Sequence, residues 1–104
     1  MERGVFISFE GSEGCGKSTQ IKRLTQFISE ELGRKVIITR EPGGTIVGEK
    51  IRELLQFTPE AGDMSDESEL LLFAASRAQL VRQLVRPCLE QGVWVIADLS
   101  LIHI

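Results

Sequence analysis

The chain has 104 residues, of which 42% are hydrophobic and 26% are charged, a balance typical of one small globular domain. Its net charge of −3 excludes a polycationic surface for a nucleic acid polymer or an anionic membrane, so any phosphate must be bound locally. The apolar runs are too short to span a bilayer, the first residues do not resemble a cleavable leader, and the two cysteines lack metal-ligand spacing. These features predict a cytoplasmic protein.

The first predicted strand, residues 5–9, runs directly into residues 11–18, a full match to the P-loop pattern G-x-x-x-x-G-K-[ST]. The alternative is a glycine-rich turn that ends in Lys-Ser by chance, but a strand before the motif and a helix beginning near Lys17 argue against it. Lys17 can neutralise phosphate charge, and the Ser18 hydroxyl suits Mg²⁺. We expect the ATP phosphates to be bound by Gly11, Ser12, Glu13, Gly14, Cys15, Gly16, Lys17, Ser18 and Thr19.

Helical spacing of apolar residues predicts a helix after the loop that ends at Gly33. Residues 36–39 are apolar without alternation, as in a strand covered on both faces. The loop 41–45 offers Thr45 as an N-cap for a short helix extending to about Phe57, and a polar connector follows over residues 58–65. The residues at helical spacing after the loop are Ile21, Leu24, Ile28 and Leu32. Those expected on the inner face of the short helix are Ile51, Leu54 and Leu55.

The second half of the chain predicts one long helix and one more strand. Asp66 and Glu69 have capping-box spacing, and residues 70–86 form an amphipathic helix that Pro87 should kink or restart. Residues 93–97 form a buried strand with Asp98 at its end. Strands that alternate with helices imply right-handed crossovers and a parallel sheet, so the predicted fold class is α/β.

Asp98 is the second candidate for chemistry. A carboxylate at the end of a buried strand in a P-loop protein supports the Mg²⁺ near the loop hydroxyl, so we expect Ser18 and Asp98 at the metal and Lys17 and Asp98 as the catalytic pair. Taken alone, an aspartate that caps the next turn would be the simpler interpretation. The P-loop in the same chain favours the metal-site role.

Three stretches together resemble bacterial thymidylate (dTMP) kinases. They are residues 9–20 around the P-loop, the sequence Thr-Arg-Glu-Pro-Gly-Gly-Thr at 39–45 followed by 48–52, and residues 71–79. The resemblance covers residues 5–98 and implies a P-loop NTPase-type, three-layer α/β/α fold. Residues 1–98 would be its amino-terminal part, with about three strands in the order 2-3-1 and the first strand at an edge. It also implies transfer of the ATP γ-phosphoryl group to dTMP with Mg²⁺, in a protein that is commonly a homodimer.

The resemblance also implies roles for the acceptor site. Phe73 would stack on thymine, and Arg77 would hydrogen-bond the edge of the base, although without the family pattern they read as a core residue and a solvated arginine. Glu13 would hold the deoxyribose 3′-hydroxyl, and Gly14 indicates the arrangement in which a later lid supplies an arginine. The dTMP-binding set is therefore expected to be Glu13, Arg40, Pro42, Phe73 and Arg77.

The sequence departs from the family pattern after Asp98. In the family, the residue after this aspartate is an arginine that binds the acceptor phosphate, but residue 99 of this chain is leucine. The last six residues can be encoded by a nucleotide run that reads like a sequencing-library adapter, so we expect residues 99–104 to be a non-native tail. Without the arginine that binds the acceptor phosphate and without the lid, the chain alone is expected to be inactive.

Three alternatives stay open at this stage. A deoxynucleoside kinase has a similar loop and a carboxylate-ended strand. A GTP-dependent switch would need Asn-Lys-x-Asp and Asp-x-x-Gly motifs, and neither occurs in this sequence. The 104 residues taken by themselves could be a non-enzymatic P-loop fragment that binds phosphate weakly.

Overall fold

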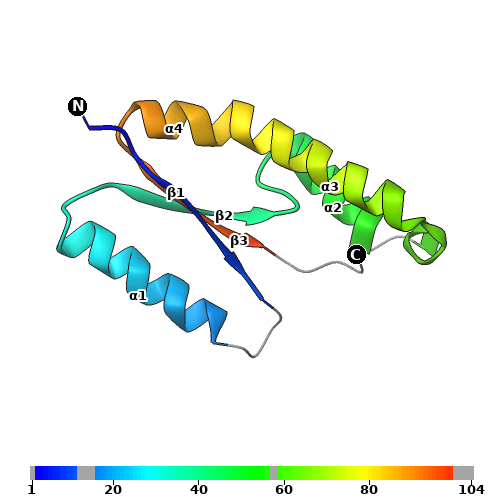
Figure 1. The fold of residues 1–104 in the computed structure, drawn as a ribbon, viewed down its shortest axis with the longest axis horizontal. Helices are drawn as coiled ribbons and strands as arrows, with labels where there is room; N and C mark the ends of the chain where they lie inside the picture. Colours follow the sequence, from blue (N-terminus) through cyan, green and yellow to red (C-terminus); the bar gives the residue numbers. More distant parts are fainter. Residues whose placement is uncertain (1, 12–15, 57–58, 100–104) are drawn as a thin grey trace.

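The computed structural model describes residues 2–11, 16–56 and 59–99. The described residues form one parallel sheet with helices on both faces (Figure 1), which confirms the α/β class and the three-layer arrangement. The strand order is β1-β3-β2, so β1 lies at one edge of the described sheet, as expected. The elements are β1 (Phe6–Glu10), α1 (Lys17–Glu30), β2 (Val36–Glu41), α2 (Ile46–Gln56), η1 (Pro59–Asp63), α3 (Asp66–Leu80), η2 (Val81–Val85), α4 (Arg86–Glu90) and β3 (Trp94–Leu99).

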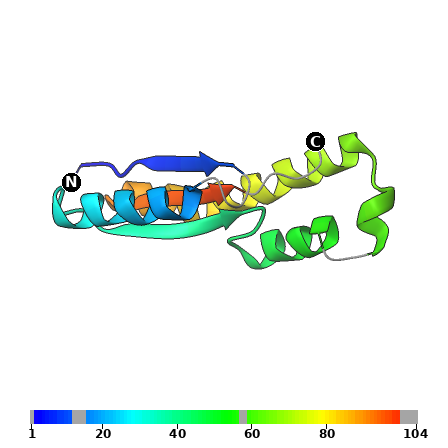
Figure 2. The same cartoon turned by 90° about the horizontal axis from the view of Figure 1, so that it is seen from below.

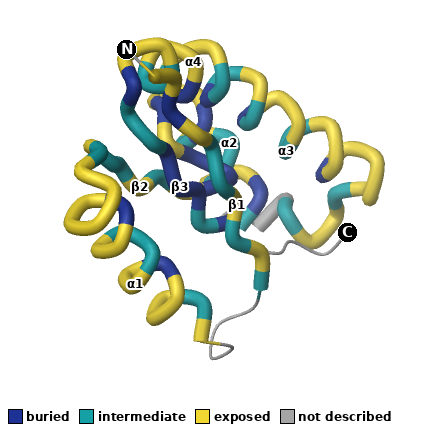
Figure 3. Tube along the Cα trace, turned by 60° about the vertical axis from the view of Figure 1, so that its left-hand side comes forward, coloured by how far each residue is buried: buried dark blue, intermediate teal, exposed yellow. Residues whose placement is uncertain are grey.

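The central strand β3 divides the core in two, because its successive side chains point to opposite faces of the sheet. Ile96 packs with Ile21 and Ile28 of α1 on one face. Val95 packs with Leu80 and Val85 on the other face, under the long helical run. Figure 3 shows the buried centre along β3, whereas the outer side of α1 is exposed.

Helix α1 begins at Lys17, as predicted, and is preceded by Gly16 in a left-handed conformation with φ 86°. The helix ends at Glu30, and Gly33 turns the chain with φ 63°. Leu32 therefore lies beyond the helix and is 44% exposed, so its inclusion among the helical residues was wrong. The apolar spacing continued past the point where the backbone leaves the helix.

Strand β2 runs two residues further than predicted, and it is not covered on both faces. Ile38 is 54% exposed because β2 is the other edge of the described sheet. An apolar run indicates a strand but does not reveal its place in the sheet. Strands β1 and β3 are also displaced toward the carboxyl side of their predicted ranges, and β3 includes Asp98 and Leu99, which pair with residues of both neighbouring strands.

The predicted N-cap of α2 is confirmed, because the Thr45 hydroxyl accepts a hydrogen bond of 2.9 Å from the Gly48 amide. The predicted capping box of α3 is wrong. Ser65 is the N-cap, and its hydroxyl accepts from the Ser68 amide at 3.1 Å, while Asp66 is the first helical residue. Serine satisfies the same orphan amides, and the acidic residues that follow it interact favourably with the helix dipole. Of the inner-face residues of α2, Leu55 is buried and Leu54 is 38% exposed.

Pro87 interrupts the regular α-helix as expected, but the irregular turn lies before Pro87 rather than at it. A proline lacks the amide that a regular helix would need at this position. The preceding turn is the π-helical segment η2, in which the Arg86 amide donates to the carbonyl of Val81, five residues back. Helix α4 then continues to Glu90, and Gly92 turns the chain into β3 with φ 79°.

The amino-terminal part of α3 extends past the sheet together with α2 (Figure 2). This arm explains a Cα radius of gyration of 14.8 Å, against about 13 Å for a compact domain of 100 residues. It also leaves apolar side chains in solvent, among them Ile46, Leu70 and Leu71. No helix in the described part of the chain is long and apolar enough to cross a membrane.

The packing of α1 on β3 predicts a large difference between two adjacent residues. Ile28 is fully buried, so Ile28→Ala should lower the free energy of unfolding of the whole protein by about 3 kcal/mol. Phe27 is 51% exposed, and Phe27→Ala should change it by less than about 0.5 kcal/mol. Urea denaturation measures both variants. Equal losses would contradict the assignment of the α1 face.

Candidate functional site

The carboxyl ends of the strands lie side by side because the parallel pairing is in register. Asp98 of β3 pairs with Phe9 of β1 on one side and with Arg40 of β2 on the other. The next position pairs Leu99 with Glu10 and Glu41. Side chains alternate between the faces, so Asp98 lies on the α1 face and Glu41 lies on the face of α3. Candidate residues that are far apart in the sequence therefore lie together at the carboxyl ends of the strands.

Lys17 and Asp98 meet on the α1 face. The ammonium of Lys17 is 2.6 Å from the Asp98 carboxylate, and it also donates to the carbonyls of Gly11, at 3.1 Å, and Leu99, at 3.2 Å. The Lys17 side chain is only 11% exposed, whereas that of Asp98 is 38% exposed. The predicted pair is thus brought together at the start of α1, where the helix dipole favours an anion.

The same corner provides oxygen donors suited to Mg²⁺. Ser18 is exposed in the first turn of α1, next to Lys17, and Asp98 offers a partly exposed carboxylate. Among the described residues, no group of three or more histidine, cysteine or acidic side chains gathers to hold a metal. This donor set fits a cation that keeps most of its water and phosphate ligands and takes only one or two from the protein.

Arg77 is anchored on the opposite face by a buried carboxylate. Its Nε donates to Glu41 Oε1 at 2.7 Å, and its Nη2 donates to Glu41 Oε2 and, at 3.1 Å, to the Ser8 hydroxyl. The guanidinium also lies 5.5 Å from the centroid of the Phe6 ring. The hydrogen bonds to Glu41 raise the pKa of Arg77. Arg77 is therefore neither free nor simply solvated.

Phe73 lies one helical turn before Arg77 on α3 and is partly exposed. Residues four positions apart share a helix face, so the two side chains predicted to contact a base project on the same side of α3. The intermediate burial of Phe73 leaves both interpretations open, a contact to a base and a residue at the margin of the core.

The loop between β2 and α2 is held by side chains of both neighbouring helices. The Gly43 amide donates to the Ser76 hydroxyl at 3.0 Å, and the Gly44 amide donates to Glu49 at 2.8 Å. Gly44 has φ 84°, and a Cβ there would lie 2.4 Å from the Thr39 hydroxyl. Only glycine fits this position, because both the backbone angle and the space exclude a side chain. Pro42, which follows a cis peptide bond, is fully buried.

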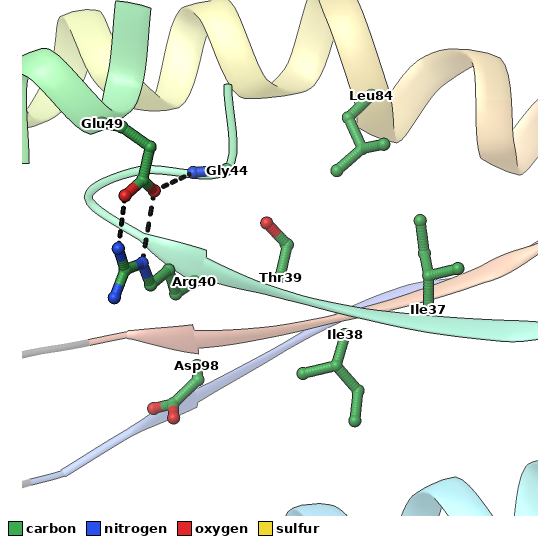
Figure 4. Close-up of a pocket in the computed structure, with 8 residues that line it drawn as sticks. All are labelled: Ile37, Ile38, Thr39, Arg40, Gly44, Glu49, Leu84 and Asp98. Carbon is green, nitrogen blue, oxygen red and sulfur yellow. Dashed lines mark hydrogen bonds and ion pairs between the residues drawn. The ribbon is translucent and has the colours of Figure 1, made fainter. Parts of the chain in front are cut away.

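Arg40 is paired with Glu49 at the end of β2 (Figure 4). The Nε and Nη2 atoms of Arg40 donate to the two Glu49 oxygens. The hydrogen bonds between the two side chains raise the pKa of Arg40, and they are the largest cause of the lowered pKa of Glu49. Arg52 lies nearby, donates to the Pro42 carbonyl at 3.0 Å, and has its pKa lowered by burial and by Arg40. Two arginines thus flank the loop.

A hollow of about 560 Å³ lies beside the end of β2. Thr39 and Ile37 project toward Leu84 on one side of the strand, and Asp98 and Ile38 project on the other (Figure 4). Phe73 and Arg77 do not line it, so the hollow adjoins Arg40 and Asp98 but not the two residues predicted to contact a base. The lining residues are Ile37, Ile38, Thr39, Arg40, Gly44, Glu49, Leu84 and Asp98.

Part of the predicted site lies outside the described residues, namely Ser12, Glu13, Gly14 and Cys15. The predicted boundary of the tail stays a prediction. Leu99 is the last residue of β3, and residues 100–104 lie outside the described part. Gly16 and Thr19 flank Lys17 and Ser18 and are exposed.

Sequence reasoning missed Glu41, Ser76, Glu49 and Arg52 as structural partners of the site. The period of two along β2 could have found the first of them, because Glu41 follows Ile37 and Thr39 on the face covered by α3. The others depend on how α2 and α3 pack around the loop, for which the sequence carries no local signal.

The Arg40–Glu49 pair predicts a pH-dependent stability. The folded-state pKa of Glu49 is below its ordinary value of 4.5, so its contribution is present above that pH and is lost as the pH falls through the folded pKa. Because both side chains are partly exposed, Glu49→Gln should lower the free energy of unfolding at pH 7 by less than about 1 kcal/mol. The difference from wild type should disappear in strong acid.

Thermal unfolding of the whole protein as a function of pH measures this difference. The control is Glu53→Gln, one turn further along α2, where the side chain is exposed and makes none of these contacts. A Glu49→Gln deficit that persists unchanged in acid would show that lost packing, not charge, is responsible.

Comparisons with known proteins identify the family of this chain. A sequence model described as thymidylate kinase matches residues 9–102. The thymidylate kinase of Bifidobacterium longum subsp. infantis is 50% identical over 97 residues, covering 91% of this chain and 41% of the relative. That of Fervidobacterium nodosum is 57% identical over 94 residues, covering 90% and 45% respectively. The chain therefore spans less than half the length of these curated relatives.

A solved structure gives the same result. The crystal structure of thymidylate kinase from Ehrlichia chaffeensis superposes with a TM-score of 0.75 and 42% identity, over 91% of this chain and 53% of that chain. With a family model that covers most of its residues, the chain belongs to the thymidylate kinase family.

Proposed function

We propose that the whole protein containing this chain transfers the γ-phosphoryl group of ATP to dTMP, giving dTDP and ADP. The observation that carries the proposal is that two ion pairs, Lys17–Asp98 and Arg77–Glu41, lie near the carboxyl ends of the parallel strands. Lys17 with Asp98 suits a triphosphate donor, and Arg77 with Phe73 suits a base. Family membership adds that relatives about half identical to this chain, over 90% or more of its residues, are named thymidylate kinase.

On the donor side, Lys17 would exchange its contacts with the Gly11 and Leu99 carbonyls for phosphate oxygens. Ser18 and Asp98 would hold Mg²⁺, which when bound neutralises charge that builds up on the phosphates. Phosphoryl transfer requires mainly positioning and charge neutralisation, so the protein needs no covalent nucleophile. We propose Lys17 and Asp98 as the catalytic pair for this reason.

On the acceptor side, Phe73 would stack on thymine and Arg77 would donate to its edge. Arg40 and Pro42 would border the monophosphate, with Arg52 as a further cation beside the loop. The hydrogen bonds that hold the loop from Ser76 and Glu49 support this role, since an acceptor must be held in place for in-line transfer. Glu13 would contact the deoxyribose.

An assay of ADP release by the whole protein tests the proposal. We expect turnover with dTMP and almost none with thymidine, whereas the reverse preference would identify a deoxynucleoside kinase. Lys17→Met should reduce turnover at least about a hundredfold, because it removes the positive charge that Lys17 places beside Asp98. Absence of ADP release with every deoxynucleoside monophosphate would contradict the proposal.

We further propose that the 104-residue chain by itself binds nucleotide phosphate but does not turn over dTMP. The support is that it spans less than half of its curated relatives, and that leucine stands at position 99 where the family pattern has arginine. In matched assays the chain alone should release ADP at less than about a hundredth of the rate of the whole protein. Comparable rates would overturn this proposal and leave the assignment of the whole protein intact.

A further inference from the structure

We propose that Glu41 is a positioning residue for the acceptor nucleotide, because its buried carboxylate fixes the guanidinium of Arg77 and leaves a defined pair of donors for the base. The inference rests on the proposed function. It concerns a residue that does not itself need to touch the base, and it follows from burial, hydrogen-bond geometry and the number of donors that an arginine has.

The first step is the burial of Glu41, whose side chain is 1% exposed. A carboxylate removed from water is costly unless it is paired, and an arginine that binds both of its oxygens supplies that pairing. Arg77 is the residue that does so among the described residues. The pair is therefore maintained whether or not a nucleotide is bound.

The second step is the count of donors. An arginine has five N–H groups, and one on Nε and two on Nη2 are used by the Glu41 carboxylate and the Ser8 hydroxyl. No described residue accepts a hydrogen bond from Nη1, and the Arg77 side chain is 39% exposed. Two donors on one edge of the guanidinium therefore remain for a ligand that offers hydrogen-bond acceptors.

The third step is the entropy of a long side chain. If Arg77 were free in solvent, it would lose the conformational entropy of several rotatable bonds on binding a base. Here Glu41, Ser8 and the ring of Phe6 already hold the guanidinium from β2 and β1, so binding costs less. Loss of the Glu41 charge should weaken the binding of the acceptor more than the binding of ATP, which is served by residues on the other face.

The test is a double-mutant cycle in the whole protein. Glu41→Gln keeps the shape and one acceptor but removes the charge, and it should raise the KM for dTMP about tenfold with kcat and the KM for ATP within about twofold. In an Arg77→Met background, Glu41→Gln should cause no further rise in the KM for dTMP, because Glu41 acts through Arg77. Glu53→Gln, an exposed charge loss on α2, should leave all three constants unchanged.

Ser8→Ala removes a second anchor of the same guanidinium from an exposed position, and it should raise the KM for dTMP about twofold to threefold. It gives a measurement even where Glu41→Gln lowers the yield of folded protein. An unchanged KM for dTMP in folded Glu41→Gln, or an equal rise with and without Arg77, would overturn the inference. Failure of the wild-type protein to phosphorylate dTMP would instead refute the proposed function.

Discussion

The in-register parallel pairing of β1 and β2 on the central strand β3 is the constraint on which the rest of the structure depends. Parallel strands end at the same edge, so the pairing places the carboxyl ends of three sequence-distant segments within reach of one another. The alternation of side chains then divides their functional groups between two faces. Asp98 lies with Lys17 of α1, and Glu41 lies with Arg77 of α3. A shift by one residue would exchange the faces and separate both pairs.

The two pairs solve different physical problems. Lys17 and Asp98 are mutually neutralised at the start of a helix, where an arriving polyanion can displace carbonyl contacts without leaving a buried charge unpaired. Glu41 is buried, so its pairing with Arg77 must persist, and the arginine is held in one orientation. Under the proposed function, Lys17 would exchange partners during the reaction cycle, while the Glu41–Arg77 pair would keep its geometry.

Much of this arrangement was predictable from local patterns. The helix start at Lys17, the N-cap at Thr45 and the buried strand before Asp98 depend on neighbouring residues, and the structure contains each of them. The failures have physical reasons. Ser65 and not Asp66 caps α3, because a cap is decided by the residue whose backbone is still extended. The exposure of Ile38 depends on the position of β2 in the sheet, which an apolar run does not encode.

The sequence by itself determined the class of fold and the family, because these depend on residue types at short, fixed spacings. Only the tertiary structure decided which charges meet. The pairing of Arg77 with Glu41 spans 36 positions and that of Lys17 with Asp98 spans 81, and both arise when strands and helices from different parts of the chain pack together. The sequence predicted Arg77 as a contact to a base, but packing around a buried carboxylate decided which of its donors remain available.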